Sequence, residues 1–454
     1  MKHAMGNYRW TICSLLFFAT TVNYLDRQVL SLLKPSLEDE FGWTNSQYAD
    51  IASTFQITYA IALLFAGRIV DRLGTKKSYS WAIILWSLGA IVHALSIPIG
   101  EALLPVVGGI GIVTVPASVL GFMFSRAILA VGEAGNFPAA IKATAEYFPK
   151  KERSFATGIF NSGTNVGAIL APLSVPWMAK TWGWQAAFIV IGAIGFLWLI
   201  FWWTYYDRPE DQKRLSKEEH DYILSDREET PAAAPGTPMA KISWYRLLAY
   251  RQTWAFTFGK FMTDGVWWFF LFWLPAYLKD QYQMTGTAIM LPLTVLYSMT
   301  MFGSIGGGFF PVYFINRGYK PYDGRMRAML LIAFIPLVVL AAQPLGGISH
   351  WLPVLLIGVG ASAHQAWSAN IFTTVSDMFP NRAVGSVVGI GGMAGGLGGV
   401  VVTKIGGALF DHYKALGHIE TGYTIMFSFC AVAYLIAWVV MKSLVPRHKA
   451  IDDL

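Results

Sequence analysis

Twelve long apolar segments constrain this chain more than any other feature of its sequence. A helix that crosses a bilayer needs about 20 mainly apolar residues, and twelve stretches of the 454-residue chain reach that length. They lie at about 10–32, 48–70, 78–97, 117–140, 154–178, 184–206, 252–278, 286–314, 327–344, 350–374, 383–409 and 421–443. Strands of a membrane β-barrel alternate in pieces of about 10 residues, whereas these runs are continuous. The sequence therefore predicts an all-α, polytopic membrane protein with 12 transmembrane helices.

Composition excludes the other broad classes. Apolar residues make up 55% of the chain and charged residues only 13%, whereas soluble domains carry about 25% charged residues. A soluble enzyme, a disordered chain and a nucleic-acid-binding chain are all inconsistent with these values. The two cysteines, Cys13 and Cys430, lie in apolar stretches, so we expect neither a disulfide framework nor a metal site.

The distribution of basic residues predicts the orientation. If both termini are cytoplasmic, the tails and cytoplasmic connections hold 26 of the 34 Lys and Arg residues. This asymmetry follows the positive-inside rule, so the net charge of +7 is a sign of topology. Only four basic residues fall on external connections, namely Lys34, Lys180, Lys279 and Lys414.

One polar stretch divides the chain. We expect a six-helix bundle at 1–206, a cytoplasmic linker at 207–250 and a second six-helix bundle at 251–454, the layout of transporters built from two related halves. Within the linker, Ser216 and Glu219 have the spacing of a helix capping box. The Gly- and Pro-rich residues 98–116 are expected to form an external loop against the membrane surface.

Charged residues inside the apolar segments are the candidates for function, because each costs several kcal/mol in a bilayer core. Six of them form three pairs of opposite sign, which lowers that cost. The pairs are Asp26 with Arg27, Arg126 with Glu133, and Lys260 with Asp264.

Helix geometry predicts how these pairs are arranged. Arg126 and Glu133 return to the same helix face but are separated by roughly 10.5 Å along the axis, so they line one path without bonding directly. Adjacent residues 26 and 27 point about 100° apart and can address different neighbours. Lys260 and Asp264 have the spacing of a side-chain pair within one helix. Carboxylates that titrate beside cations are the minimum needed to couple protons to an anion.

Structural roles stay open for each of these residues. The pair of Lys260 and Asp264 can be a self-neutralising helix pair, and Arg126 and Glu133 a structural bridge. Asp26 and Arg27 can be solvated at the end of their segment. His364 lies beside further polar residues and is a candidate ligand contact on equal terms with a structural role.

A motif between the second and third segments resembles a known family. Residues 67–77 read GRIVDRLGTKK, which is similar to the loop of the major facilitator superfamily, a family of two-bundle transporters. The resemblance implies a charge latch at the cytoplasmic gate. The motif positions are Gly67, Arg68, Asp71, Arg72, Gly74 and Lys76.

Further stretches resemble the anion:cation symporter branch of that superfamily. They are NYLDR at 23–27, Arg126 followed by EAGNFP at 133–138, YFPKKERS at 147–154 and GIFNSG at 158–163. Together with AHQA at 363–366, they look most like the bacterial hexuronate transporters, which import glucuronate and galacturonate.

The resemblance implies a role for individual residues. Asp26 and Glu133 match the protonation carboxylates of the branch, and Arg27 and Arg126 match groups that pair with those acids or with the substrate carboxylate. The remaining substrate contacts implied by the resemblance are Tyr24, Tyr59, Asn161, Thr164, Lys260, Trp267, His364 and Gln365. Thr164 and Gly392 stand where a galactonate carrier is expected to have Gln and Asn, which favours a hexuronate.

We therefore expect a transporter, not an enzyme, that imports a sugar-acid anion by proton symport and alternating access. The expected partners are the sugar acid, protons and the lipid bilayer, with no cofactor, no nucleic acid and a monomeric state. The expected location is the inner membrane of a bacterium. Alternatives that stay open are the same fold carrying galactonate, an aldarate or an aromatic carboxylate, and an anion channel, for which rings of like charge are expected in place of mixed pairs. A membrane enzyme lacks support because no catalytic motif is present.

Overall fold

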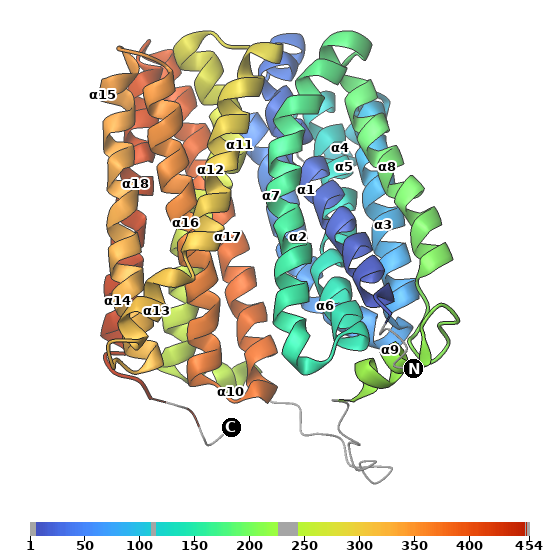
Figure 1. The fold of residues 1–454 in the computed structure, drawn as a ribbon. Helices are drawn as coiled ribbons and strands as arrows, with labels where there is room; N and C mark the ends of the chain where they lie inside the picture. Colours follow the sequence, from blue (N-terminus) through green and yellow to red (C-terminus); the bar gives the residue numbers. More distant parts are fainter. Residues whose placement is uncertain (1–5, 110–114, 226–243, 450, 452–454) are drawn as a thin grey trace.

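The fold consists of helices that run roughly parallel between two ends of the molecule (Figure 1). The computed structural model describes residues 6–109, 115–225, 244–449 and 451, and these residues contain no β-strand. The start of α1 and the end of α18 lie at the same end of the helices. We call this the terminal end, and we call the other the far end.

The first half of the chain, up to Tyr205, supplies the following elements. They are α1 (Tyr8–Phe41), α2 (Asn45–Leu73), α3 (Thr75–Val92), η1 (His93–Leu95), α4 (Ser96–Gly109), α5 (Ala117–Glu133), α6 (Asn136–Tyr147), α7 (Lys150–Trp182) and α8 (Trp184–Tyr205). Two short helices, α9 (Lys217–Leu224) and α10 (Trp244–Leu248), lie at the terminal end before the second half begins.

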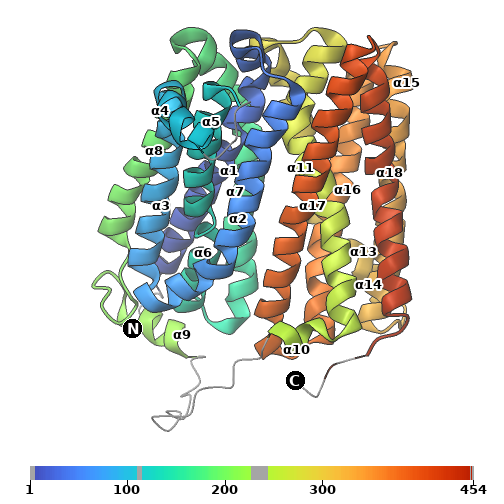
Figure 2. The ribbon, with the colours of Figure 1, turned by 180° about the vertical axis from the view of Figure 1, so that it is seen from behind.

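The second half begins at Arg251. It contains α11 (Arg251–Tyr282), η2 (Gly286–Ile289), α12 (Met290–Gly306), α13 (Phe309–Ile315), α14 (Pro321–Phe334), η3 (Ile335–Ala341), α15 (Ala342–Gly346), α16 (Trp351–Met378), α17 (Asn381–Ala415) and α18 (Ile419–Leu444). The two halves meet where α2 packs against α17, α7 against α12, and α1 against α11. Figure 2 shows α2, α11 and α17 next to one another from behind.

Eight helical stretches of the described residues are long and apolar enough to cross a membrane. They are Asn45–Val70, Thr75–Gly109, Ala117–Tyr147, Trp184–Tyr205, Gly286–Ile315, Pro321–Gly346, Ser386–Ala415 and Ile419–Leu444. The chain is thus an all-α, multi-pass membrane protein, and the number of twelve spans stays a prediction.

The four helices outside this set are long but more polar. Helices α1, α7, α11 and α16 contain 34, 33, 32 and 28 residues, so even α16 extends about 42 Å against a hydrocarbon core of about 30 Å. Each carries at least two of the residues that the sequence predicts for the site.

Residues 98–116 correct one expectation. Where a loop was predicted, Ser96–Gly109 forms α4, which continues α3 through the 3-10 turn His93–Leu95; residues 110–114 lie outside the described part. A Cβ on Gly100 would stand 1.7 Å from the Ala117 carbonyl oxygen, and one on Gly121 would stand 1.7 Å from that of Ser96. Gly100, which lies in the stretch predicted as a loop, and Gly121 thus let the backbones of α4 and α5 touch.

The linker helix α9 is attached to the first half. The Ser216 hydroxyl accepts a hydrogen bond from the Glu219 amide at 3.2 Å, as the N-cap prediction requires. The Glu219 carboxylate, however, accepts bonds from the amides of Tyr8 and Arg9 and pairs with the Arg9 guanidinium at 3.0 Å. It therefore caps the start of α1, and its own helix has only half of the predicted capping box.

Candidate functional site

An ion pair buried between α1 and α5 forms the centre of the candidate site. The Arg27 guanidinium donates to Glu133 Oε2 from Nε at 2.9 Å and from Nη2 at 2.7 Å. The two side chains are 4% and 0% exposed. The seven-residue spacing predicted that Arg126 would not bond to Glu133, and it does not. Arg126 instead donates to the Arg27 carbonyl oxygen at 3.2 Å.

Next to this pair lie polar groups with no protein partner. Asp26 is 2% exposed, and neither of its carboxylate oxygens has a hydrogen-bond partner. Arg126 is 1% exposed, and its Nε and Nη1 donors are also unpartnered. Asp26 lies within electrostatic range of both Arg126 and Glu133. As predicted, residues 26 and 27 address different neighbours, although they are adjacent in the sequence.

Aromatic rings surround the Arg27 guanidinium. Its carbon lies 4.7 Å from the centroid of Tyr24 and 4.9 Å from that of Tyr59, so the structure places both predicted tyrosines at the ion pair. Two further rings were missed from sequence, those of Phe55 at 5.3 Å and Trp268 at 5.4 Å. Trp268 lies on α11 and so brings the second half of the chain into contact with Arg27.

The predicted second-half residues form a separate cluster. Lys260 pairs with Asp264 within α11, with Nζ 2.6 Å from Oδ2. Trp267 stacks on His364 with centroids 5.1 Å apart, and His364 Nδ1 lies 2.9 Å from the Tyr434 hydroxyl. His364 is buried and held from two sides, which fits the structural alternative as well as a ligand contact.

Other predicted contacts have no place in either cluster. On α7, Asn161 is exposed and Thr164 is half-buried. This helix approaches α1 closely, because a Cβ on Gly167 would stand 2.4 Å from the Thr21 carbonyl oxygen. On α16, Gln365 is half-buried.

The motif at residues 67–77 forms the tight turn between α2 and α3 at the terminal end. Gly74 has φ +79°, a conformation that favours glycine, which explains why one residue suffices between the helices. Lys76 pairs at 2.7 Å with Asp207, at the start of the linker. Arg68 and Arg72 are exposed, Gly67 faces open space, and the side chain of Asp71 lies outside what the structure describes.

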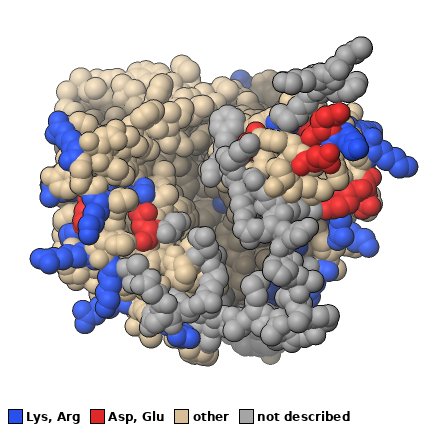
Figure 3. All heavy atoms as spheres, turned by 60° about the horizontal axis from the view of Figure 1, so that its bottom comes forward, with Lys and Arg blue, Asp and Glu red and all other residues tan. Residues whose placement is uncertain are grey.

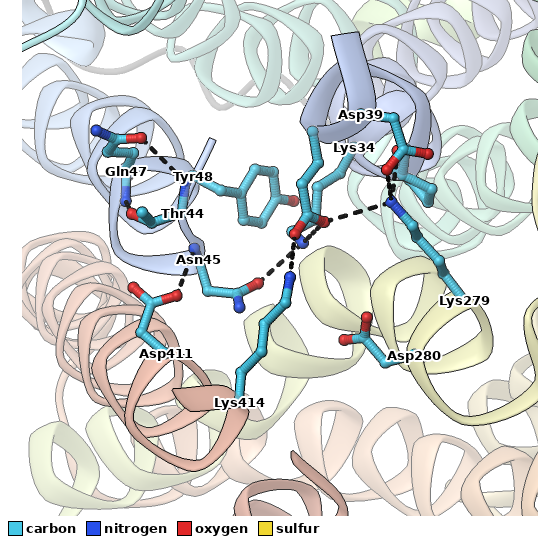
Figure 4. A network of polar contacts seen from close by, with 12 residues as sticks. Lys34, Asp39, Thr44, Asn45, Gln47, Tyr48, Lys279, Asp280, Asp411 and Lys414 are labelled. Carbon is cyan, nitrogen blue, oxygen red and sulfur yellow. Dashed lines mark hydrogen bonds and ion pairs between the residues drawn. The ribbon is translucent and has the colours of Figure 1, made fainter. Parts of the chain in front are cut away.

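At the far end, a network of ion pairs joins the two halves (Figure 4). The Glu38 carboxylate of α1 lies 2.8 Å from Lys34 Nζ and 2.8 Å from Lys414 Nζ of α17. Lys279 of α11 lies 3.8 Å from Glu38 and 2.5 Å from Asp39. Three of the four lysines that the sequence places outside the membrane therefore converge on one carboxylate, which no sequence signal indicated. We call these five residues the far-end latch.

Further hydrogen bonds extend the same closure. Asp411 of α17 accepts from the amides of Asn45 and Ser46 at 2.8 Å each, at the start of α2. Deeper in the molecule, the Tyr48 hydroxyl donates to the Phe272 carbonyl oxygen at 2.8 Å. These contacts seal the two halves against each other at the far end.

Glu38 lies beyond the predicted span 10–32, and its ionised form is stabilised by its neighbours. Burial alone would raise the pKa of its carboxyl, but the ammonium groups of Lys34 and Lys414 outweigh burial and lower that pKa to about 2. The Glu38 carboxylate is therefore ionised at any ordinary pH.

The terminal end lacks such a network of ion pairs between the halves among the described residues. Between described residues, the ion pairs that join the halves are those of Lys279, Lys404 and Lys414 with α1 or α2. Figure 3 shows the face at the terminal end hollowed between the halves, with Lys and Arg side chains around it. The described part of the chain is thus closed at the far end and open toward the terminal end.

The described residues contain no group of three or more His, Cys, Asp or Glu side chains arranged to hold a metal ion. The chemistry available in this region is therefore that of carboxylates, guanidinium and ammonium groups, and aromatic rings. Such groups bind anions and exchange protons.

Comparison with known proteins identifies the class. Residues 16–403 match the Major Facilitator Superfamily, and the chain belongs to this family. The prediction drawn from the motif is confirmed, and the protein is a membrane transporter and not an enzyme.

Two relatives show where the chain lies within the family. It is 28% identical over 445 residues to the hexuronate transporter of Escherichia coli K12, covering 98% of this chain and 95% of that protein. It is 32% identical over 306 residues to the galacturonate transporter of Dickeya chrysanthemi, covering 67% of this chain and 82% of that protein.

Solved structures share the fold. A D-xylose–proton symporter superposes with a TM-score of 0.73 at 14% identity, covering 98% of this chain and 100% of the other. A bacterial homologue of the lysosomal transporter Spinster, in an inward-facing and occupied conformation, gives 0.69 at 19% identity, with 97% of each chain covered.

Proposed function

We propose that this protein imports a sugar-acid anion, with a hexuronate such as glucuronate or galacturonate as substrate, by proton symport across a bacterial inner membrane. The relatives that cover nearly the whole chain support the substrate class. The observation that carries the proposal is the buried Arg126, whose Nε and Nη1 donors lack a protein partner. A guanidinium with free donors is suited to a bidentate bond with a carboxylate.

Two acids beside Arg126 supply the proton sites in this proposal. A carboxylate buried without a partner is stable only in its neutral form, so Asp26 carries a proton in the arrangement seen here. Glu133 is ionised through its pair with Arg27. Opposite charges about 4 Å apart interact by about 4 kcal/mol at an effective dielectric constant of 20. Losing or gaining a proton on either acid therefore changes how strongly the arginines attract a substrate carboxylate.

Alternating access follows from the two halves. We propose residues 1–206 and 251–454 as the moving bundles, each with six spans once α1, α7, α11 and α16 are included, and 207–250 as the linker. The basic residues at the terminal end support a cytoplasmic placement of both termini. The far-end latch then closes the outer gate, and the conformation faces the cytoplasm. The carrier needs no cofactor in this scheme and works as a monomer.

Uptake of radiolabelled glucuronate into proteoliposomes under an imposed pH gradient tests the proposal. Accumulation that depends on the gradient and is abolished by a protonophore is the expected result. Saturable uptake separates a carrier from a channel. Glucuronate entry that neither saturates nor responds to the gradient would reject proton symport.

A further inference from the structure

A second ion pair lies inside the membrane region, on α11 of the second half. Lys260 Nζ contacts both oxygens of Asp264, at 2.6 Å and 2.9 Å. The Lys260 side chain is 6% exposed and that of Asp264 is 19% exposed. The Lys260 ammonium also lies 4.4 Å from the centroid of the Phe372 ring. This pair is buried, but its carboxylate is the more accessible partner.

The surroundings of the pair place it near the ion pair of the first half. We call the region that contains Arg27, Arg126, Glu133, Lys260 and Asp264 the substrate space. Asp264 lies within electrostatic range of Tyr24 on α1 and of Tyr434 on α18, and Lys260 is within range of His364 on α16. On α17, Gly395 leaves the room that the Asp264 carboxylate occupies, because a Cβ there would stand 2.2 Å from Oδ2. Tyr24 also packs on Arg27. Tyr24 is therefore near both ion pairs, which come from opposite halves of the chain.

The charges of this space do not cancel. The cations are Arg27, Arg126 and Lys260, and the acids paired with two of them are Glu133 and Asp264. The unpartnered acid of α1 is neutral in the arrangement described above. One positive charge is therefore left over, on Arg126, and this matches a substrate with a single carboxylate. A second carboxylate has no free cation while Asp264 holds Lys260.

We propose that the carrier also transports sugar diacids, and that each diacid enters with one more proton than a monoacid, accepted by Asp264. The inference rests on the proposed function, because it assigns the first carboxylate to Arg126. A proton that binds to an oxygen of Asp264 removes one negative charge and releases the Lys260 ammonium. The ammonium then binds the second carboxylate. The added substrate charge and the added proton cancel, so the loaded space has the same net charge with either substrate.

The physical reason for the extra proton is desolvation. A carboxylate moved from water into this space without a cation loses several kcal/mol, and Asp264 would add repulsion. Releasing Lys260 avoids both costs. A hydrogen bond to a charged group contributes about 1.5–3 kcal/mol, so losing Lys260 is expected to lower kcat/KM for a diacid about 10-fold or more.

Proteoliposomes containing the full chain test the inference with glucuronate and glucarate. The proton-to-substrate ratio, measured from reversal potentials, is expected to be about one unit higher for glucarate. In Lys260→Met, the ratio of kcat/KM for glucarate to that for glucuronate is expected to fall about 10-fold or more. In Asp264→Asn, the ratio of protons to glucarate is expected to fall to that of glucuronate.

The double variant Lys260→Met with Asp264→Leu guards against misfolding, because replacing both partners of a buried pair by apolar side chains is often neutral for stability. It is expected to show the same loss of preference for glucarate. Lys404→Met removes an ion pair with Asp50 outside this space and is expected to leave the ratio of the two substrates unchanged.

The outcomes separate the two proposals. Gradient-driven uptake of glucuronate by the unaltered chain, without uptake of glucarate, would reject this inference and leave the proposed function intact. Equal proton ratios for both substrates, or equal losses for both in the Lys260 variants, would also overturn it. Failure of glucuronate uptake itself would reject the proposed function and this inference with it.

Discussion

The two halves of the chain treat their buried polar groups differently. Of 21 buried side-chain polar atoms without a hydrogen-bond partner among the described residues, 17 belong to residues 23–136 of the first half. The second half instead pairs Lys260 with Asp264 and His364 with Tyr434. Unpaired buried polar atoms cost about 1–3 kcal/mol each, and those of Asp26, Arg126 and Glu133 lie at the candidate site.

This difference indicates which half is expected to bind the substrate carboxylate and the coupling proton. The first half contains both arginines and the two acids proposed for proton symport, whereas the second half lines the space with rings and one ion pair, whose acid is proposed to accept the extra proton of a diacid. Trp268 connects the two, because it reaches Arg27 from α11. Substitutions in the first half are therefore expected to affect binding and coupling, and those in the second half selectivity and packing.

The largest effect is expected for Arg126→Lys. A lysine ammonium cannot reproduce the planar pair of donors, and disrupting a buried charge pair costs about 2–5 kcal/mol, a loss of roughly 30-fold or more in kcat/KM for glucuronate. Initial uptake rates measure it. The matched control is Arg325→Lys, because Arg325 pairs with Asp377 away from the site. Equal losses in both variants would contradict the assignment of Arg126 to the substrate.

Glu133→Gln is expected to remove accumulation while keeping exchange. The amide cannot take up a proton as the carboxylate does, so a pH gradient no longer drives glucuronate uphill, but counterflow of labelled against unlabelled glucuronate continues. Both are measured in the same vesicles. Glu101→Gln on exposed α4 is the control. Full gradient-driven accumulation in Glu133→Gln would show that the coupling proton binds elsewhere.

Gly398→Ala tests the packing of the second half. A Cβ there would stand 1.9 Å from the Phe261 carbonyl oxygen, whereas one on Gly389 would meet nothing within 4 Å. Overpacking costs about 1–3 kcal/mol, so the melting temperature in detergent is expected to fall for Gly398→Ala and not for Gly389→Ala. A similar melting temperature for both would mean that α11 and α17 separate easily.

The smallest effect is expected from pH at the far-end latch. Because the pKa of Glu38 is lowered to about 2, the closure it provides is fully present above the ordinary pKa of a glutamate and is lost only as pH falls below that ordinary value to about 2. Spin labels on cysteines at the exposed positions Thr181 and His418 are expected to report the same distance at pH 8 and pH 5. Glu38→Gln is expected to lengthen the distance at both. A change between pH 8 and pH 5 in the unaltered chain would contradict the latch as described.

Local spacing predicted much of the site. The 100° separation of residues 26 and 27, the lack of a bond between Arg126 and Glu133, and the pair within α11 all follow from the geometry of one helix and are confirmed. The loop at 98–116 was wrong, because glycine serves helix contact there as well as it serves a turn.

Contacts between distant parts of the chain were not predictable. Residues 38, 279 and 414 carry no local signal of meeting, and their contact depends on how the halves pack. The contact of Trp268 with Arg27 was likewise not predictable from the sequence. Adjacent residues face different neighbours, and the sequence does not say which neighbour holds Arg27.

The polarity of α1, α7, α11 and α16 has a consequence for synthesis. Each Asp, Lys or Arg at the centre of a helix opposes insertion by about 2.5–3.5 kcal/mol, and α1 carries Asp26 and Arg27 side by side. Such a helix is not stable in lipid alone and needs contacts with neighbouring helices. For α1 these contacts are the Glu133 carboxylate of α5 and the rings of α2. Insertion of this carrier into the bilayer therefore depends on contacts between its helices. Mutations that remove these charges are expected to favour insertion and to weaken substrate binding.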